Sequence, residues 1–223
     1  DYDEAIRQTE DRLNKSGVKY FDFFKVHTLY GSVEDIKTKT GILKAFEHLK
    51  KQGKVRYLAA SQHNNIPEIC SALIESGLFD ALQPAFSFGA GKDYFEMLEL
   101  AKKHDVGIIC MKSVSGLDAF KKEKELMTAL GPEGMPARAL LRWVLSVPGV
   151  TACVPLIKNF KEFSEDIGAA TGESMAYQQD TINYYASENC LFCGACEKRC
   201  PRNIRVADIL RYSMYHKRYD GAQ

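Results

Sequence analysis

A helix, a stop and a strand follow one another in the stretch Gly41-Ile-Leu-Lys-Ala-Phe-Glu-His-Leu-Lys-Lys-Gln-Gly53-Lys-Val55-Arg-Tyr-Leu-Ala-Ala60. Its apolar side chains recur at helical spacing and would share one face with an upstream isoleucine, the set being Ile36, Leu43, Phe46 and Leu49. Gly53 is a typical helix stop because glycine adopts the left-handed backbone without steric cost. The apolar run that starts at Val55 then predicts a buried strand.

The same succession of strand and helix repeats along most of the chain. Strand-length apolar runs begin near Tyr20, Val55, Phe79, Val106 and Val150. Helical spacing of apolar residues follows at Ile69, Leu73 and Ile74; at Phe95, Leu98 and Ala101; at Ala139, Leu140, Trp143 and Val144; and at Phe160, Phe163 and Ile167. Strands joined by crossover helices run parallel. Five such units predict a parallel sheet, either doubly wound or in a (β/α)8 barrel.

Both architectures carry their chemistry at the carboxyl ends of the strands. The polar residues that the sequence places at those ends are Lys25 and His27, Ser61 with Gln62 and His63, Gln83, Lys112 with Ser113, and Lys158. These side chains are the candidates for binding and catalysis.

Charge and hydropathy exclude some partners. Lysine and arginine total 30 against 29 aspartates and glutamates, which gives a formal net charge of +1. Such a balance provides no overall attraction to nucleic acid or to an anionic membrane surface. No apolar run reaches the roughly 18 residues that a membrane span requires.

Four of the seven cysteines crowd into the run Cys190-Leu-Phe-Cys193-Gly-Ala-Cys196-Glu-Lys-Arg-Cys200-Pro201. The spacing C-x2-C-x2-C-x3-C-P is that of the bacterial ferredoxin run. Zinc is the rival ion, but structural zinc sites more often use two separated C-x2-C pairs. The run therefore predicts a [4Fe-4S] cluster held by Cys190, Cys193, Cys196 and Cys200, with a remote cysteine as the alternative fourth ligand.

The three remaining cysteines and the charged residues after residue 190 do not require a metal site to explain them. Cys70, Cys110 and Cys153 stand singly, which is typical of small buried side chains. From Cys190 onward, seven lysines and arginines stand against three acids. This surplus fits a docking face for an acidic redox partner of ferredoxin or flavodoxin type, while an ordinary solvated surface is the alternative.

Three stretches and the ending resemble the aldo/keto reductase family, in the subset that carries a C-terminal ferredoxin-like segment. They are Lys19-Tyr-Phe-Asp-Phe-Phe-Lys-Val-His27, the opening stretch as far as Tyr57, Ala139-Leu-Leu-Arg-Trp-Val144, and Asp208-Ile-Leu-Arg-Tyr-Ser-Met-Tyr215. The resemblance implies a (β/α)8 barrel, of which about five C-terminal strand–helix units are expected here, with their strands parallel and adjacent in chain order. It also implies that the sequence starts inside the helix after the third strand. We expect residues 1–175 to form this partial barrel and residues 176–223 to form a linker helix and the iron–sulfur segment.

The resemblance also implies an activity, the reduction of a carbonyl or the oxidation of an alcohol by hydride transfer with a nicotinamide cofactor, NAD(P)H. His27 matches the family histidine that orients and polarises the carbonyl oxygen. The other members of the family's catalytic set, an aspartate, a tyrosine and a lysine, are expected in the earlier units, so this sequence holds only part of the active site.

The expected cofactor residues are Ser61 and Gln83, which match the family's carboxamide-binding positions, and Lys112. The asparagine usual after the serine is Gln62 here. The stretch 154–162 departs from the family's lysine–serine pair and arginine that grip a 2′-phosphate.

Two function classes remain open at this level. The first is an oxidoreductase acting on a small carbonyl or alcohol, accompanied by the cluster. The second is an electron-transfer or assembly subunit whose barrel serves only as a scaffold. The presence in the gene of the three earlier units would favour the enzyme. The expected location is the cytoplasm.

Overall fold

The computed structural model describes residues 1–88, 90–114, 136–171, 196, 199–202 and 204–219. Five strands form one parallel sheet in the order β1-β2-β3-β4-β5. Their bounds are β1 Phe21–His27, β2 Val55–Gln62, β3 Ala81–Pro84, β4 Gly107–Cys110 and β5 Ala152–Cys153. The predicted parallel order is therefore confirmed.

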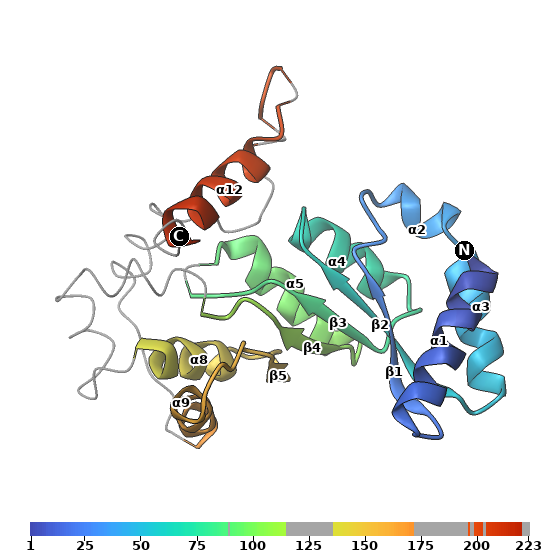
Figure 1. Cartoon of the computed structure of the whole chain (residues 1–223). Coiled ribbons are helices and arrows are strands. Elements are labelled where there is room, and N and C mark those ends of the chain that lie inside the picture. Colours follow the sequence, from blue (N-terminus) through green and yellow to red (C-terminus); the bar gives the residue numbers. More distant parts are fainter. Residues whose placement is uncertain (89, 115–135, 172–195, 197–198, 203, 220–223) are drawn as a thin grey trace.

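The helices follow the strands in alternation, as Figure 1 shows. Their bounds are α1 Tyr2–Ser16, α2 Glu34–Thr38, α3 Gly41–Lys51, α4 Ile66–Glu75, α5 Lys92–Lys103, α8 Pro136–Ser146, α9 Phe160–Ala170 and α12 Val206–Tyr219. Gly53 and Gly77 lie just beyond α3 and α4 with φ of 70° and 66°. Gly53 therefore ends its helix in the left-handed conformation that the sequence predicted, and Gly77 ends α4 in the same way.

One predicted helix is wrong in its extent. The apolar positions from Ile36 to Leu49 suggested a single helix, but the structure has two, α2 and α3. The chain leaves the helical conformation at Lys39, where φ is −85° and ψ is 54°. The Lys39 ammonium donates to the Leu29 carbonyl oxygen at 2.7 Å and also pairs with Asp35. These contacts fix the break, and the local apolar spacing could not show it.

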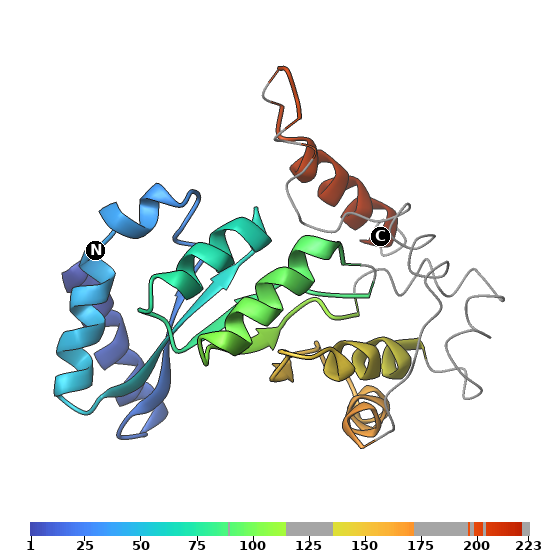
Figure 2. The same ribbon diagram turned by 180° about the vertical axis from the view of Figure 1, so that it is seen from behind.

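The core lies between the sheet and the helices that cover one of its faces. Figures 1 and 2 view the strands from opposite sides, with α4 and α5 packed along them. Strand residues of this face are almost fully buried, namely Val26, Leu58, Ala60, Leu82, Ile108 and Cys110. They meet side chains from α3, α4, α5 and α8 in one hydrophobic cluster. Burial of this kind stabilises the sheet at about 25 cal/mol per Å² of apolar surface.

Helix α9 is confirmed in position, but its apolar stripe lies outside that core. Phe160, Phe163 and Ile167 are 88%, 45% and 50% exposed. The helix packs on α8 through its small residues instead: Ala169 is buried, and the Gly168 carbonyl accepts from Arg142 Nη2 at 3.2 Å.

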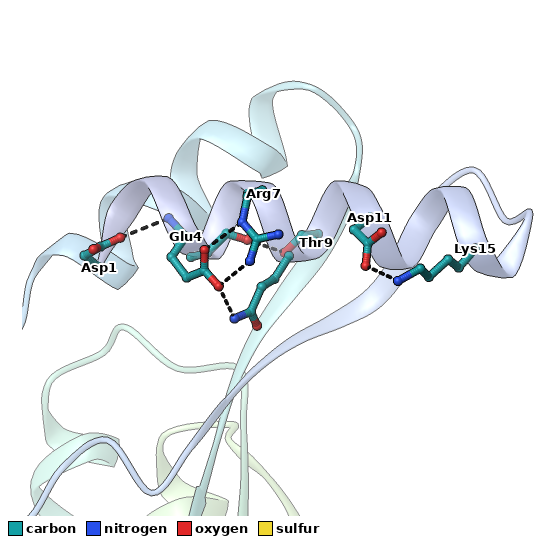
Figure 3. A network of polar contacts seen from close by, with 8 residues as sticks. Asp1, Glu4, Arg7, Thr9, Asp11 and Lys15 are labelled. Atoms are coloured by element: carbon teal, nitrogen blue, oxygen red, sulfur yellow. Dashed lines mark hydrogen bonds and ion pairs between the residues drawn. The ribbon is translucent and has the colours of Figure 1, made fainter.

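Helix α1 packs on α3 and presents a polar outer surface (Figure 3). Its N-cap is Asp1, whose carboxylate accepts from the Glu4 backbone N–H at 2.9 Å. Two nitrogens of Arg7 donate to the Glu4 carboxylate, and together with Gln8 they lower the pKa of Glu4 to about 2. Ion pairs this exposed add little to the free energy of unfolding.

The C-terminal region is described only in part. The predicted linker helix, Cys190 and Cys193 lie outside the described residues. The division at residues 175 and 176 therefore stays a prediction. Among the described helices, none is both long and apolar enough to cross a membrane.

Candidate functional site

Three of the four predicted barrel site residues lie in one row across the sheet. In the strand register His27 is the partner of Ser61, and Ser61 is the partner of Gln83. Side chains of register partners project from the same face of a parallel sheet. The row therefore places an imidazole, a hydroxyl and an amide side by side at the carboxyl ends of β1, β2 and β3, on the face opposite the helix-covered core.

The fourth residue, Lys112, lies beyond this row. It follows β4, where Met111 still bridges to Ala85, and its side chain is half-buried. Its backbone is left-handed, with φ of 56°. The structure thus places Lys112 at the same edge of the sheet, two strands from Ser61.

The row is extended by a lysine on β1. Lys25 lies two residues before His27 and therefore on the same face of the strand. Its Nζ donates to Oε1 of Gln83 at 2.5 Å, reaching over β2 to β3. This hydrogen bond fixes the amide of Gln83 with its oxygen toward Lys25, so that its NH₂ group is left to face other partners.

A second imidazole meets His27 at the sheet edge. His63 comes directly after β2, and its Nε2 lies 3.1 Å from Nε2 of His27. The two ring centroids are 5.0 Å apart and the planes are inclined by 57°. The two imidazole rings thus face each other through their Nε2 atoms.

Ser61 and Gln62 differ in how their polar atoms are satisfied. The Ser61 hydroxyl is buried and has no hydrogen-bond partner among the described residues. Gln62 is also buried, but its Nε2 donates to the carbonyl oxygens of Tyr30 at 3.0 Å and Asn64 at 2.7 Å. Gln62 therefore ties together the loops that follow β1 and β2 through its Nε2, while its Oε1, like the Ser61 hydroxyl, has no hydrogen-bond partner among the described residues.

Backbone strain gathers at the same edge. In the described chain, the non-glycine residues with positive φ are Thr28, Asn65, Lys112 and Asp105. The first three follow β1, β2 and β4 at their carboxyl ends, and only Asp105 precedes a strand. Left-handed conformations are costly for β-branched residues such as Thr28. Strain of this kind concentrates at binding and catalytic sites, so it marks this edge independently of the side chains.

The loop after β5 leads into a helix cap. The side-chain Oδ1 of Asn159 accepts a hydrogen bond from the Glu162 backbone N–H at 2.9 Å. The Glu162 carboxylate accepts one from the Lys158 backbone N–H at 2.7 Å. This reciprocal arrangement satisfies the Glu162 amide in the first turn of α9 and the Lys158 amide just before the helix. Lys158 lies on this loop, five residues beyond the end of β5, and is exposed.

Two of the four predicted cluster ligands can be located. Cys196 and Cys200 are both half-buried, and the Sγ of Cys200 accepts a hydrogen bond from the Ile204 backbone N–H at 3.3 Å. No group of three or more histidine, cysteine or acidic side chains gathers within the described part of the chain. Cys190 and Cys193 are outside that part.

The scattered cysteines are mostly as expected. Cys70 and Cys110 are fully buried, and burial raises the pKa of the Cys70 thiol to about 12. Cys153 is half-buried, so the expectation of a buried residue holds only in part for it.

Sequence reasoning placed His63 and Lys25 at the strand ends without assigning either a role. The available signal was their position in the sequence. His27 is the last residue of its strand and His63 directly follows the next strand, while Lys25 lies two residues before His27 and therefore on the same face of β1. The pairing of the two imidazoles depends on strand register and ring rotation, which local sequence does not report.

Comparison with known proteins identifies the relatives of this arrangement. The model of the family described as "Aldo/keto reductase family" matches residues 1–184. A comparison with curated protein sequences found no match.

Solved structures give the same result for the fold. An aldo-keto reductase from Bacillus halodurans in its holo form is 16% identical, with a TM-score of 0.63 over 82% of this chain and 66% of its own. An aldo-keto reductase from Klebsiella pneumoniae in complex with NADPH is 15% identical, with a TM-score of 0.60 over 88% of this chain and 66% of its own. One from Brucella melitensis is 17% identical, with a TM-score of 0.60 over 83% of this chain and 68% of its own. The chain thus spans about two thirds of the length of these structures.

Proposed function

The chain belongs to the aldo/keto reductase family of oxidoreductases, and from this we propose that it forms the carbonyl-polarising and nicotinamide-holding part of an NAD(P)H-dependent carbonyl reductase. The observation that carries the proposal is the row His27–Ser61–Gln83 in the strand register. The K. pneumoniae relative binds NADPH. The substrate class is a small carbonyl compound or the corresponding alcohol.

The residues present fit the nicotinamide end of such a cofactor. A buried hydroxyl without a partner costs free energy, and Ser61 has one. A carboxamide oxygen or NH₂ group would satisfy it. Gln83 lies next to it, with its own amide oriented by Lys25. Ser61 and Gln83 would therefore hold the carboxamide, and Lys112 lies at the same edge to contact the cofactor.

In the reaction, the reduced nicotinamide supplies the hydride. His27 would orient the carbonyl and stabilise the negative charge that develops on its oxygen by donating a hydrogen bond from Nε2, in place of the contact of this atom with Nε2 of His63. A proton must also reach that oxygen, and we assign this step to a group that the described residues do not include.

We further propose that the cysteine run holds a [4Fe-4S] cluster. The ferredoxin spacing supports this, and so does the Ile204 N–H donated to the Cys200 sulfur, because cluster thiolates commonly accept such bonds. The exposed Arg199 and Arg202 supply positive charge for an acidic redox partner of ferredoxin or flavodoxin type, while Arg205 forms an ion pair with Asp208. A thiolate-held cluster suits a reducing compartment such as the cytoplasm.

One anaerobic preparation of the full chain tests both parts. NADH and NADPH are titrated, with nucleotide fluorescence as the readout, against the parent chain, Ser61→Ala and Gln83→Ala. We expect each variant to weaken binding several-fold through the lost hydrogen bond, and the exposed control Ser164→Ala to leave it unchanged. Equal binding by all variants contradicts the cofactor site.

The same preparation is analysed for iron and sulfide. We expect about four irons per chain and a broad absorption near ~400 nm. Both are lost in Cys196→Ser and Cys200→Ser and retained in the control Cys70→Ser. Stoichiometric zinc without iron would overturn the cluster.

A further inference from the structure

We propose that His27 and His63 form a two-imidazole binding site for a divalent transition metal ion of the Zn²⁺, Ni²⁺ or Cu²⁺ class. The site lies at the carboxyl edge of β1 and β2, away from the cysteine run in sequence. It requires neither a bound nucleotide nor the cluster.

The geometry of the pair is close to that of two ligands of one ion. The Nε2 atoms are 3.1 Å apart while the ring centroids are 5.0 Å apart, so the nitrogens point inward between the rings. A tetrahedral ion with Zn–N bonds of about 2.0–2.1 Å separates two ligand nitrogens by roughly 3.3 Å. The distance between the two nitrogens therefore needs to change by only a few tenths of an ångström for the imidazoles to share an ion.

The backbone holds both imidazoles in place before any ion arrives. His27 ends β1 within its ladder, and the next residue, Thr28, donates its N–H to the Ser61 carbonyl at 3.0 Å. Gln62, which directly precedes His63, is tied to the Tyr30 carbonyl at 3.0 Å. Both chain segments are thus fixed on each other, and ordering entropy opposes metal binding less than it would on free loops.

The donor set selects the ion. Neutral imidazole nitrogen suits zinc, copper and nickel, whereas magnesium and calcium require oxygen ligands. Two imidazoles leave further positions for water, so an ion held here stays exchangeable. The ammonium of Lys25 lies on the same face, and its repulsion lowers the affinity. We therefore expect reversible binding to an open site.

The competing explanation is an ordinary hydrogen bond between the two rings. In that case one Nε2 carries a proton and the other accepts it, and each ring has a different tautomer. A metal ion must displace that proton. Observing the ring nitrogens directly distinguishes the two arrangements.

The site has a consequence for catalysis that rests on the proposed function. An ion on Nε2 of His27 occupies the atom assigned to the carbonyl oxygen. Bound metal would thus block polarisation of the substrate. The metal site itself is tested without any activity measurement.

The experiment titrates Zn²⁺ into the anaerobic full chain labelled with ¹⁵N-histidine. Long-range ¹H–¹⁵N spectra report each imidazole nitrogen, so zinc bound by cysteines does not interfere. We expect the Nε2 signals of His27 and His63 to shift together and saturate at one added ion per pair. His48, whose ring nitrogens contact Tyr2 and Gln52, and the exposed His104 should not shift with them. Mg²⁺ at the same concentration should shift none of them.

Variants complete the test. His63→Ala should abolish the zinc-dependent shift at His27, and His27→Ala should abolish the shift at His63, while His104→Ala preserves both. Far-UV circular dichroism verifies that each variant is folded. Complementary tautomers that Zn²⁺ does not perturb would overturn the metal site, as would a His27 shift that persists in His63→Ala. Neither result affects the nucleotide titration, so the two proposals fail separately.

Discussion

The two faces of the parallel sheet differ in the exposure of their side chains although they are built from the same strands. Leu58 and its neighbour Tyr57 on β2 point in opposite directions, and they are 1% and 48% exposed. The face that carries Leu58 packs against the helices and is buried from solvent. The face of Tyr57 carries Phe23, Lys25 and His27, all of them exposed in the described part of the chain.

This difference separates stability from chemistry. On the helix-covered face a residue contributes by excluding water and filling volume. On the other face Lys25 and His27 are exposed near the carboxyl edge, where strained backbone and unsatisfied groups accumulate. Substitutions should therefore affect the free energy of unfolding on one face and ligand binding on the other.

The largest expected effect comes from replacing Leu58, and its neighbour Tyr57 on β2 is replaced separately for comparison. Leu58→Ala removes a side chain packed in the core and should lower the free energy of unfolding by about 2–5 kcal/mol. Tyr57→Ala removes a partly exposed ring that contacts Phe23 at a centroid distance of 5.6 Å. Its expected cost is about 0.2–1 kcal/mol. Urea denaturation of both variants measures the difference, and equal losses would contradict the division between the faces.

An intermediate effect is expected where a loop approaches a core helix. Gly149 has φ of 91°, and a Cβ there would lie 2.8 Å from the Leu98 carbonyl oxygen on α5. Gly149→Ala should lower the free energy of unfolding by about 2–4 kcal/mol, since left-handed strain and the backbone clash add.

The matched control for this prediction is Gly53→Ala. Gly53 has φ of 70°, but nothing lies within 4 Å of its Cβ position. This control isolates the strain, at about 1–2 kcal/mol. A control variant as destabilised as Gly149→Ala would show that close packing against α5 contributes nothing.

The smallest effect at neutral pH is expected at Tyr30, whose hydroxyl is buried without a hydrogen-bond partner. Burial raises the pKa of Tyr30 from 10.0 to about 12. Below pH 10 both the folded and the unfolded chain keep the proton. Between pH 10 and 12 the unfolded chain releases it first, so stability falls as pH rises.

Tyr30→Phe should remove this slope, which amounts to about 1 kcal/mol by pH 11. At pH 7 the same variant should change the free energy of unfolding by less than about 1 kcal/mol. Denaturation curves from pH 8 to 11 measure the slope. A Tyr30→Phe slope equal to that of the parent chain would contradict the assignment.

Local pattern was sufficient where one physical constraint dominates. Five apolar runs separated by helical spacing favour crossover connections, so the parallel direction of the strands followed from their pattern, and their order followed from the family resemblance. Gly53 and Gly77 ended helices because glycine tolerates positive φ. The break at Lys39 was not predictable, because a side-chain contact with Leu29, ten residues away, helps to fix it.

The stripe on α9 shows the opposite limit. Phe160, Phe163 and Ile167 have the spacing of a buried face, and periodicity predicts a helix correctly from it. Periodicity does not say which neighbour covers that face. In the described structure α9 turns Gly168 and Ala169 toward α8, because small residues allow the two helices to approach.

The sequence by itself determined the parallel direction of the strands, the ends of two helices, the ferredoxin spacing of the cysteines and the strand ends at which polar residues gather. These features depend on residue type and on spacing along the chain, which are local. Only the tertiary structure decided that His27, Ser61 and Gln83 share a row, that Lys25 reaches Gln83, and that His63 turns its Nε2 toward that of His27. Those relations depend on the register between strands and on side-chain rotation, which are settled by packing between segments distant in sequence.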